Sequence, residues 1–240
     1  FKDAKVEFIS ADRKAASGQS TDRVFIGTGG GQFDEHKEGL RTCAGSLVFE
    51  YLKEQNLIPA DKLIKNALEK LIQWNLLVDT GQAPNSEFDV FSVQSFIRSK
   101  DNSPESSLKS VELGSEILNR ILKVLRKKEQ SILDWGSRVE FESKFGKSIA
   151  VVSETVDREF CREQEGKLFL MYHPKYPSVQ FFGPEVDLEP IYKKVKELDP
   201  EASWFLHQSH HMVICGSSSA PDSKPTKLSF EQLIEVAKEV

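Results

Sequence analysis

The sequence predicts an α/β protein of two domains joined by a long helix. Strand-like apolar runs alternate with helical patterns in the first 77 residues, and the same alternation returns from residue 147 onward. Between them, apolar residues recur at four-residue steps from Leu113 to Leu125, in a helical pattern that extends toward Phe145. We therefore place an α/β domain at 1–107, a connecting helix at 108–146 and a smaller α/β domain at 147–240.

The first domain is expected to begin with a half-alternating strand at Lys5–Ile9, followed by a polar loop over 11–22. Arg23–Ile26 is typical of a short buried strand, and the Gly-Thr-Gly-Gly-Gly run that follows ends it. A helix is predicted from Thr42, and a second over Ala60–Leu77, where Pro59 and Asp61 mark its start.

The segment 80–107 is rich in turn residues but also carries aromatic side chains that could pack on the surface or line a cleft. These apolar residues are Phe88, Val90, Phe91, Val93 and Phe96. In the last domain, 217–225 reads as a small polar loop, and the other segments have strand or helix patterns. The predicted strands are 149–152, 168–172, 179–182, 204–206 and 211–215, and the predicted helices are 189–198 and 228–238.

Composition excludes several classes of protein. With 39% hydrophobic and 29% charged residues, the chain is expected to be globular rather than disordered. No apolar run approaches the roughly 18 residues that span a bilayer, so no membrane partner is expected. A net charge of −5 excludes a broadly basic nucleic-acid surface but leaves a local basic groove open. Three widely spaced cysteines and no visible secretory signal indicate reduced thiols and a cytoplasmic location.

The first candidate site is the run Asp34, Glu35 and His36, which follows the predicted buried strand and its glycines. Carboxylate and imidazole ligands together suit manganese, iron or zinc. Ligands also bind where strands of an open α/β sheet end. The alternative is a tight turn with a solvated charged tip.

Two further candidates are weaker when taken alone. Asp79 directly follows an amphipathic helix, where it could bind a ligand or cap the local backbone. His207, His210 and His211 lie beside a Gly/Ser loop that begins at Gly216, and such a cluster could hold phosphate. It could instead hold zinc, although paired cysteines are absent, or form only a structural turn.

Taken in order, these motifs resemble the DHH phosphoesterases, and in particular their melanocyte-proliferating-gene (Myg) branch. Phe25-Ile-Gly-Thr-Gly-Gly-Gly-Gln-Phe-Asp-Glu-His resembles the family's strand followed by Val-Gly-Gly and Asp-His-His. The run from Thr42 to Leu52 is similar to its Ser-Ser-Ala-Gly-Leu helix, and Leu77-Val-Asp-Thr-Gly to its Ala-Val-Asp-Asn-Gly segment. Trp204-Phe-Leu-His-Gln-Ser resembles its Phe-Val-His-Ala-Ser segment, and 226–237 its closing helix.

The resemblance implies a DHH-type domain and a C-terminal domain of the DHHA1 type. It also implies a metal-dependent phosphoesterase that uses Mn²⁺ or another divalent cation to cleave short RNA or another nucleotide. Asp34, Glu35, His36 and Asp79 would be the metal ligands, and Asp34, His36 and Asp79 would be catalytic. His207, His210, His211 and Gly216 would bind the substrate phosphate. A homodimer is the candidate assembly.

Two departures from the family pattern motivate an alternative. Glu35 stands where the family has the middle His, and the family's earlier His/Asp motif would lie upstream of Phe1. We therefore expect either a shortened member or a degraded DHH scaffold that binds a nucleotide or a protein without catalysis. A third interpretation is an assembly subunit without a site.

Overall fold

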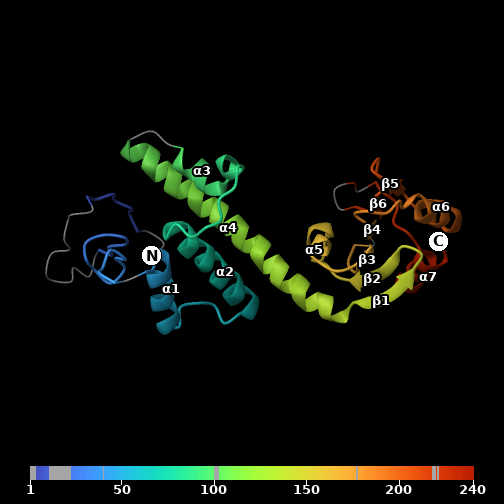
Figure 1. The fold of residues 1–240 in the computed structure, drawn as a ribbon, viewed down its shortest axis with the longest axis horizontal. Helices are drawn as coiled ribbons and strands as arrows, with labels where there is room; N and C mark the ends of the chain where they lie inside the picture. Colours follow the sequence, from blue (N-terminus) through green and yellow to red (C-terminus); the bar gives the residue numbers. More distant parts are fainter. Residues whose placement is uncertain are drawn as a thin grey trace. The chain divides into compact units, whose positions relative to one another are not determined.

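The fold is taken from a computed structural model, which describes residues 4–10, 23–39, 41–99, 103–176, 178–217, 220 and 222–240. The chain has a mixed α/β fold, with a six-stranded mixed sheet and one long helix (Figure 1). It divides into two compact units, Phe1–Arg126 and Lys127–Val240, which we call the N-terminal and the C-terminal unit. Of the helices in the described residues, none is both long and apolar enough to cross a membrane.

The N-terminal unit is built from helices. They are α1 (Ala44–Glu54), α2 (Lys62–Asp79), the short 3₁₀ helix η1 (Asp89–Phe91), α3 (Val93–Arg98) and the first part of α4 (Pro104–Asp134). Asp61 caps α2, because its Oδ1 accepts hydrogen bonds from the N–H groups of Leu63 and Ile64. α1 and α2 approach closely at Gly45, where an added Cβ would overlap Asn75 Oδ1. The two predicted helices are therefore confirmed, each beginning about two residues later than expected.

The two strands predicted for the first domain do not form in the described residues. Lys5–Ile9 belongs to no helix or strand, and Arg23–Ile26 contributes a single bridge between Ile26 and Phe33. Val24 and Ile26 are each more than half exposed, which contradicts the prediction of a buried strand. A strand is stable only when a neighbour pairs with its backbone, and the described part of this unit supplies no such neighbour. The predicted polar loop over 11–22 lies outside the described residues.

The connecting helix was predicted too long. α4 ends at Asp134, a 3₁₀ turn, η2 (Trp135–Ser137), follows, and Val139–Ser143 forms strand β1. β1 pairs antiparallel with β2 (Gly146–Val152) through a tight turn, and Gly146, the first residue of β2, has a φ of +97°. The prediction failed because Val-Glu-Phe-Glu-Ser alternates with a period of two, as a strand does, and a helical period was extended over it.

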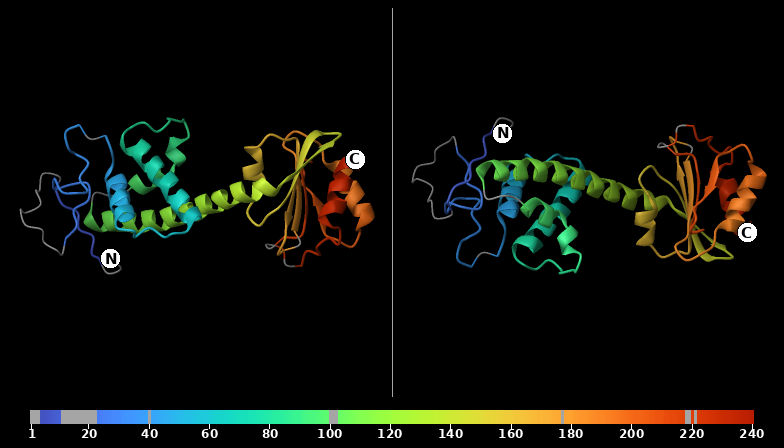
Figure 2. Two further views of the ribbon diagram at one scale, coloured as in Figure 1. Left: turned by 90° about the horizontal axis from the view of Figure 1, so that it is seen from below. Right: turned by 90° about the horizontal axis from the view of Figure 1, so that it is seen from above.

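The C-terminal unit is a mixed sheet covered on both faces. Its other strands are β3 (Leu168–His173), β4 (Ser178–Phe182), β5 (Trp204–Leu206) and β6 (Met212–Cys215), and the order across the sheet is β1-β2-β3-β4-β6-β5. β2 and β3 are parallel, and the other neighbours are antiparallel. Helices α6 (Glu189–Leu198) and α7 (Phe230–Glu239) cover one face, and α5 (Arg158–Arg162) lies against the other (Figure 2).

Side chains of the central strands alternate between two apolar cores. Leu168 and Leu170 of β3 pack in the core beneath α6 and α7, whereas Phe169 and Met171 pack with Phe160 of α5. All four β3 side chains are buried, as expected for a strand with both faces covered. The strands and helices predicted for 149–240 are confirmed within about three residues at their ends, and the polar loop over 217–225 is described only in part.

Candidate metal centre

The glycine-rich loop of the N-terminal unit reverses the chain and brings its acidic end back beside its start. Gly27, Gly29 and Gly30 all have positive φ values, between +67° and +82°, which residues with a Cβ rarely adopt. The Gly27 N–H donates to the Phe33 carbonyl at 2.8 Å. The Phe33 ring packs edge-on against Tyr51 of α1 with centroids 5.3 Å apart. The loop is therefore anchored to α1 immediately before its acidic residues.

Asp34 is the buried member of this loop, with 6% of its surface exposed. Its carboxylate accepts hydrogen bonds from the Gly30 N–H at 2.6 Å and the His36 N–H at 3.0 Å, and His36 Nδ1 lies 3.0 Å from Oδ1. The backbone hydrogen bonds from His36 and then Gly30 are the main reasons why the pKa of Asp34 is below its usual range. Asp34 is therefore a fixed, ionised carboxylate.

The carboxylate of Glu35 lies against backbone and has an unsatisfied oxygen. A Cβ placed on Gly27 would be 3.7 Å from Glu35 Oε1 and 3.8 Å from Cβ of Ala44, the first residue of α1. Glu35 Oε2 is inaccessible to solvent and has no hydrogen-bond partner among the described residues. A buried acceptor without a partner costs about 1–3 kcal/mol, and more when it is charged. A cation at this point would remove that cost.

His36 is exposed and surrounded by negative charge. Its pKa is raised chiefly by the hydrogen bond to Asp34 and then by the charge of Glu35, with a smaller contribution from Asp79. Nδ1 lies 3.0 Å from Asp34 Oδ1, so it is the ring nitrogen that His36 offers to a cation shared with the Asp34 carboxylate.

Together these three residues form a donor set for a divalent cation. One ligand atom from each of Asp34, Glu35 and His36 lies within 4.8 Å of the other two. Two carboxylates and one imidazole suit first-row transition cations such as Mn²⁺. The orphaned oxygen of Glu35 and this donor set both fit a bound metal.

Asp79 lies apart from the three clustered residues. It is the last residue of α2, it is exposed, and it does not belong to the group whose ligand atoms lie within 4.8 Å of one another. Its charge nevertheless contributes to the raised pKa of His36. The structure thus brings together Asp34, Glu35 and His36, with Asp79 as a more distant carboxylate.

The histidines of the C-terminal unit lie together in the turn between β5 and β6. The Ser209 N–H donates to His207 Nδ1 at 3.2 Å, so the proton of a neutral His207 ring is on Nε2. His210 Nδ1 lies 3.1 Å from Asp187 Oδ1, and His211 Nδ1 lies 2.9 Å from the Val186 carbonyl. His207 Nδ1 therefore accepts a hydrogen bond, whereas Nδ1 of His210 and of His211 faces an oxygen acceptor.

Gly216 does not lie beside these histidines. The turn precedes β6 and Gly216 follows it, so the two lie at opposite ends of a four-residue strand, which spans roughly 13 Å. Gly216 is buried with a φ of +73°. A single phosphate held by both the histidines and Gly216 is therefore not supported by this placement.

Sequence reasoning missed the carboxylates that face His210. Asp187 and Glu189 follow β4, and with His210 they form a second group whose ligand atoms lie within 4.8 Å of one another. No local signal could have found them, because they are separated from His210 by more than 20 residues of sequence and meet it only through the tertiary fold.

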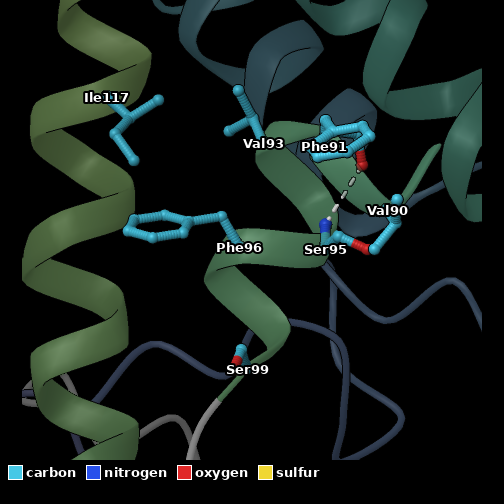
Figure 3. A pocket seen from close by; sticks show the side chains of 8 residues that line it. Val90, Phe91, Val93, Ser95, Phe96, Ser99 and Ile117 are labelled. Atoms are coloured by element: carbon cyan, nitrogen blue, oxygen red, sulfur yellow. Dashed lines mark hydrogen bonds between the residues drawn. The ribbon is translucent and has the colours of Figure 1, made fainter. Parts of the chain in front are cut away.

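Two aromatic residues of 80–107, Phe91 and Phe96, line an open apolar pocket while remaining largely exposed, so the segment combines the two predicted alternatives. The pocket has a volume of about 670 Å³ and is open to solvent; η1, α3 and α4 bound it, and Phe96 points across it toward Ile117 (Figure 3). Phe88 is exposed and does not belong to its lining. Among the described residues no charged side chain lines the pocket, so it does not suit a phosphate-bearing substrate.

Comparison with known proteins finds only distant likeness, to solved structures. No protein-family model matches the chain, and no curated protein matches it. A solved structure described as the DHH domain of a member of a ribosomal protein family aligns with 81% of this chain at 14% identity and a TM-score of 0.35. The aligned region is 45% of that protein, less than half its length. A TM-score this low does not assign the fold or the family.

Proposed function

We propose that the chain is a metal-dependent phosphoesterase that cleaves phosphodiester bonds in short RNA or another nucleotide. The observation that carries the proposal is the buried Glu35 Oε2, which has no hydrogen-bond partner among the described residues and lies beside Asp34 and His36. The order of the sequence motifs that resemble DHH phosphoesterases supplies the reaction class and the substrate class.

In this proposal, Asp34, Glu35 and His36 hold the cation, Mn²⁺ in the first instance, and Asp79 completes its shell. When bound, such a cation polarises phosphoryl oxygens and makes water a nucleophile near neutral pH. The Gly30 and His36 N–H groups fix the Asp34 carboxylate, so one ligand is oriented before a cation arrives. The negative charge of Asp79 attracts the cation to the exposed side of the loop.

His207 is the residue that we propose to contact the substrate phosphate. With Nδ1 accepting from Ser209, Nε2–H is its free donor, and a phosphate oxygen is an acceptor. His210 is less suited to this role, because the Asp187 and Glu189 carboxylates beside it repel an anion.

A binding module without catalysis is the second candidate. It is favoured by the position of Asp79, which lies outside the group of three ligands. Three clustered ligands can hold one cation, whereas a two-metal phosphoesterase site needs ligands for a second. This candidate predicts that a nucleotide binds and is not cleaved, with or without EDTA.

The test is hydrolysis of a short labelled RNA in Mn²⁺ and in EDTA, using three proteins. Glu35→Gln keeps the side-chain shape and removes one ligand charge, and Glu38→Gln is the matched control, an exposed residue of the same segment. We expect Mn²⁺-dependent release of nucleotides by the wild type and Glu38→Gln, and a loss of at least about tenfold in Glu35→Gln, as for removal of a metal ligand's support. Hydrolysis that is equal in all three proteins, or unaffected by EDTA, would contradict the proposal.

A further inference from the structure

A second cluster of metal-binding side chains lies in the C-terminal unit, separate from the proposed centre at Asp34. It consists of Asp187 and Glu189, at the start of α6, and His210, in the turn between β5 and β6. One ligand atom from each lies within 4.8 Å of the others. His210 Nδ1 and Asp187 Oδ1 are 3.1 Å apart.

The two segments that carry these residues are held together by backbone hydrogen bonds. The Leu188 N–H donates to the His210 carbonyl at 2.9 Å, and the Gly183 N–H donates to the His211 carbonyl at 3.0 Å. The Leu188 side chain between the two carboxylates is fully buried in the core beneath α6 and α7. The backbone that carries the three ligand residues is therefore fixed, so less conformational entropy is lost when a cation binds.

The two neighbouring imidazoles present different ring nitrogens. His210 Nδ1 lies 3.1 Å from Asp187 Oδ1, so Nδ1 is the atom that His210 offers to a cation shared with the Asp187 carboxylate. A carbonyl oxygen only accepts hydrogen bonds, so His211 Nδ1 must carry the proton that faces Val186. A neutral His211 therefore keeps its Nε2 lone pair free, and a ring nitrogen bonded to a backbone carbonyl is a usual support of a metal-bound histidine.

The existing partners of the Asp187 and Glu189 carboxylates would compete only weakly with a cation. Glu189 Oε1 pairs with Lys193 Nζ at 2.9 Å, and the side chains of both residues are well exposed. Exposed ion pairs of this kind contribute little, so a divalent cation can displace the lysine. Asp187 Oδ1 accepts from the Glu189 N–H at 2.9 Å, which orients the carboxylate and leaves its second oxygen available.

We propose that Asp187, Glu189 and His210 bind a transition-metal cation of the Zn²⁺ class, with the His211 imidazole beside them. The imidazole favours Zn²⁺, Co²⁺ or Ni²⁺ over Mg²⁺ and Ca²⁺, and the two carboxylates exclude an anion. This site is independent of the proposed phosphoesterase centre, because it lies in the other unit and shares no residue with it.

The test is a titration of the full chain with ZnCl₂ by calorimetry and with Co²⁺ by its visible absorption, in a Glu35→Gln background that disables the first centre. Asp187→Asn keeps the shape of the side chain and removes a charged ligand. His210→Asn removes the imidazole at a φ of +59°, a conformation that asparagine tolerates better than most residues. Glu185→Gln is the control, since it removes one negative charge from the same loop outside the cluster.

We expect affinity for Zn²⁺ and Co²⁺ to fall at least about tenfold in Asp187→Asn and in His210→Asn, and to stay unchanged in Glu185→Gln. Circular dichroism verifies that each variant is folded. Equal affinity in all four proteins, or an equal loss in Glu185→Gln, overturns the proposal. Because the first centre is disabled throughout, neither result depends on the phosphoesterase activity.

Discussion

The two units differ in how much apolar surface they bury. Of the described apolar residues, the N-terminal unit buries only Cys43, Phe49 and Ala67, whereas the C-terminal unit buries 25 on the two faces of its sheet. Several large apolar side chains of the N-terminal unit are more than half exposed, including Phe88 and Phe91. Hydrophobic burial is the main source of stability, so the C-terminal unit has the larger reserve.

The proposed metal centre at Asp34 lies in the unit that buries less apolar surface. The loop around Asp34 is held by a few hydrogen bonds and one ring contact with Tyr51, and it contains an unsatisfied carboxylate oxygen. A bound cation would join Asp34, Glu35 and His36 and would therefore contribute folding energy where packing contributes least. The C-terminal unit can be folded without such help.

The largest expected effect is a core substitution in the C-terminal unit. Phe181 of β4 is fully buried beneath α6 and α7, so Phe181→Ala should lower the free energy of unfolding by about 3–5 kcal/mol. Phe49→Ala in α1 should cost less, because few buried side chains surround it. Guanidinium unfolding of both variants measures the difference, and a larger loss in Phe49→Ala would contradict the comparison.

Mn²⁺ should stabilise the N-terminal unit selectively. At a free concentration roughly 100 times its dissociation constant, a bound ion adds about 2.7 kcal/mol to the free energy of unfolding. Hydrogen exchange should therefore slow in the loop from Ile26 to His36 and in α1, while β2 to β4 stay unchanged. Glu35→Gln should abolish this protection and Glu38→Gln should keep it. Equal protection of both units would mean that the ion does not act through the loop.

A buried carboxylate of the C-terminal unit makes that unit sensitive to acid. Asp199 Oδ2 accepts from the Lys227 N–H and from Thr226 Oγ1, each at 2.8 Å. The backbone hydrogen bond from Lys227 is the main cause that lowers the pKa of Asp199, against the opposing effect of burial. Asp199→Ala should therefore cost about 2 kcal/mol at neutral pH, as for other hydrogen bonds to a charged group.

The stabilisation that the Asp199 carboxylate provides should be lost in acid. Because the folded pKa of Asp199 is below the unfolded value of about 3.8, protons bind the unfolded state first as pH falls. The contribution of the Asp199 carboxylate to stability is complete above the unfolded pKa and is lost as pH falls through the folded pKa. Urea unfolding from about pH 7 to about pH 2 should show a steeper acid loss in the wild type than in Asp199→Ala. Parallel curves would exclude this role.

The smallest expected effect is the loss of a helix cap in the N-terminal unit. Asp61→Ala removes the acceptor for the Leu63 and Ile64 N–H groups and should destabilise the unit by about 1 kcal/mol. Asp61→Asn keeps the cap and loses the exposed pair with Arg126, so it should cost much less. Thermal unfolding followed by circular dichroism measures both. An equal loss would assign the effect to the ion pair.

The sequence was most informative where local pattern and tertiary packing agree. The helix at 189–198 was predicted with both of its ends correct, because its apolar residues Ile191 and Val195 face the core at helical spacing. The strands Lys5–Ile9 and Arg23–Ile26 were wrong, since a strand pattern does not supply the neighbouring strand that stabilises it. Strand β1 was missed because its alternation directly follows a long helical pattern.

The candidate sites, too, were predictable only as far as local sequence determines them. Asp34, Glu35 and His36 are contiguous, so their proximity follows from the sequence itself, whereas their burial depends on the fold. The separation of Gly216 from the histidine turn, and the contact of Asp187 with His210, depend on how β4, β5 and β6 are arranged. The residues proposed for catalysis and substrate binding remain predictions.

The most direct measurement is a calorimetric titration of the wild type, Glu35→Gln and Glu38→Gln with MnCl₂. If Asp34, Glu35 and His36 form the metal centre, the wild type and Glu38→Gln bind Mn²⁺ equally, and Glu35→Gln binds it at least about tenfold more weakly. Equal affinity in Glu35→Gln and Glu38→Gln would show that the buried oxygen of Glu35 binds no cation, and would contradict the account.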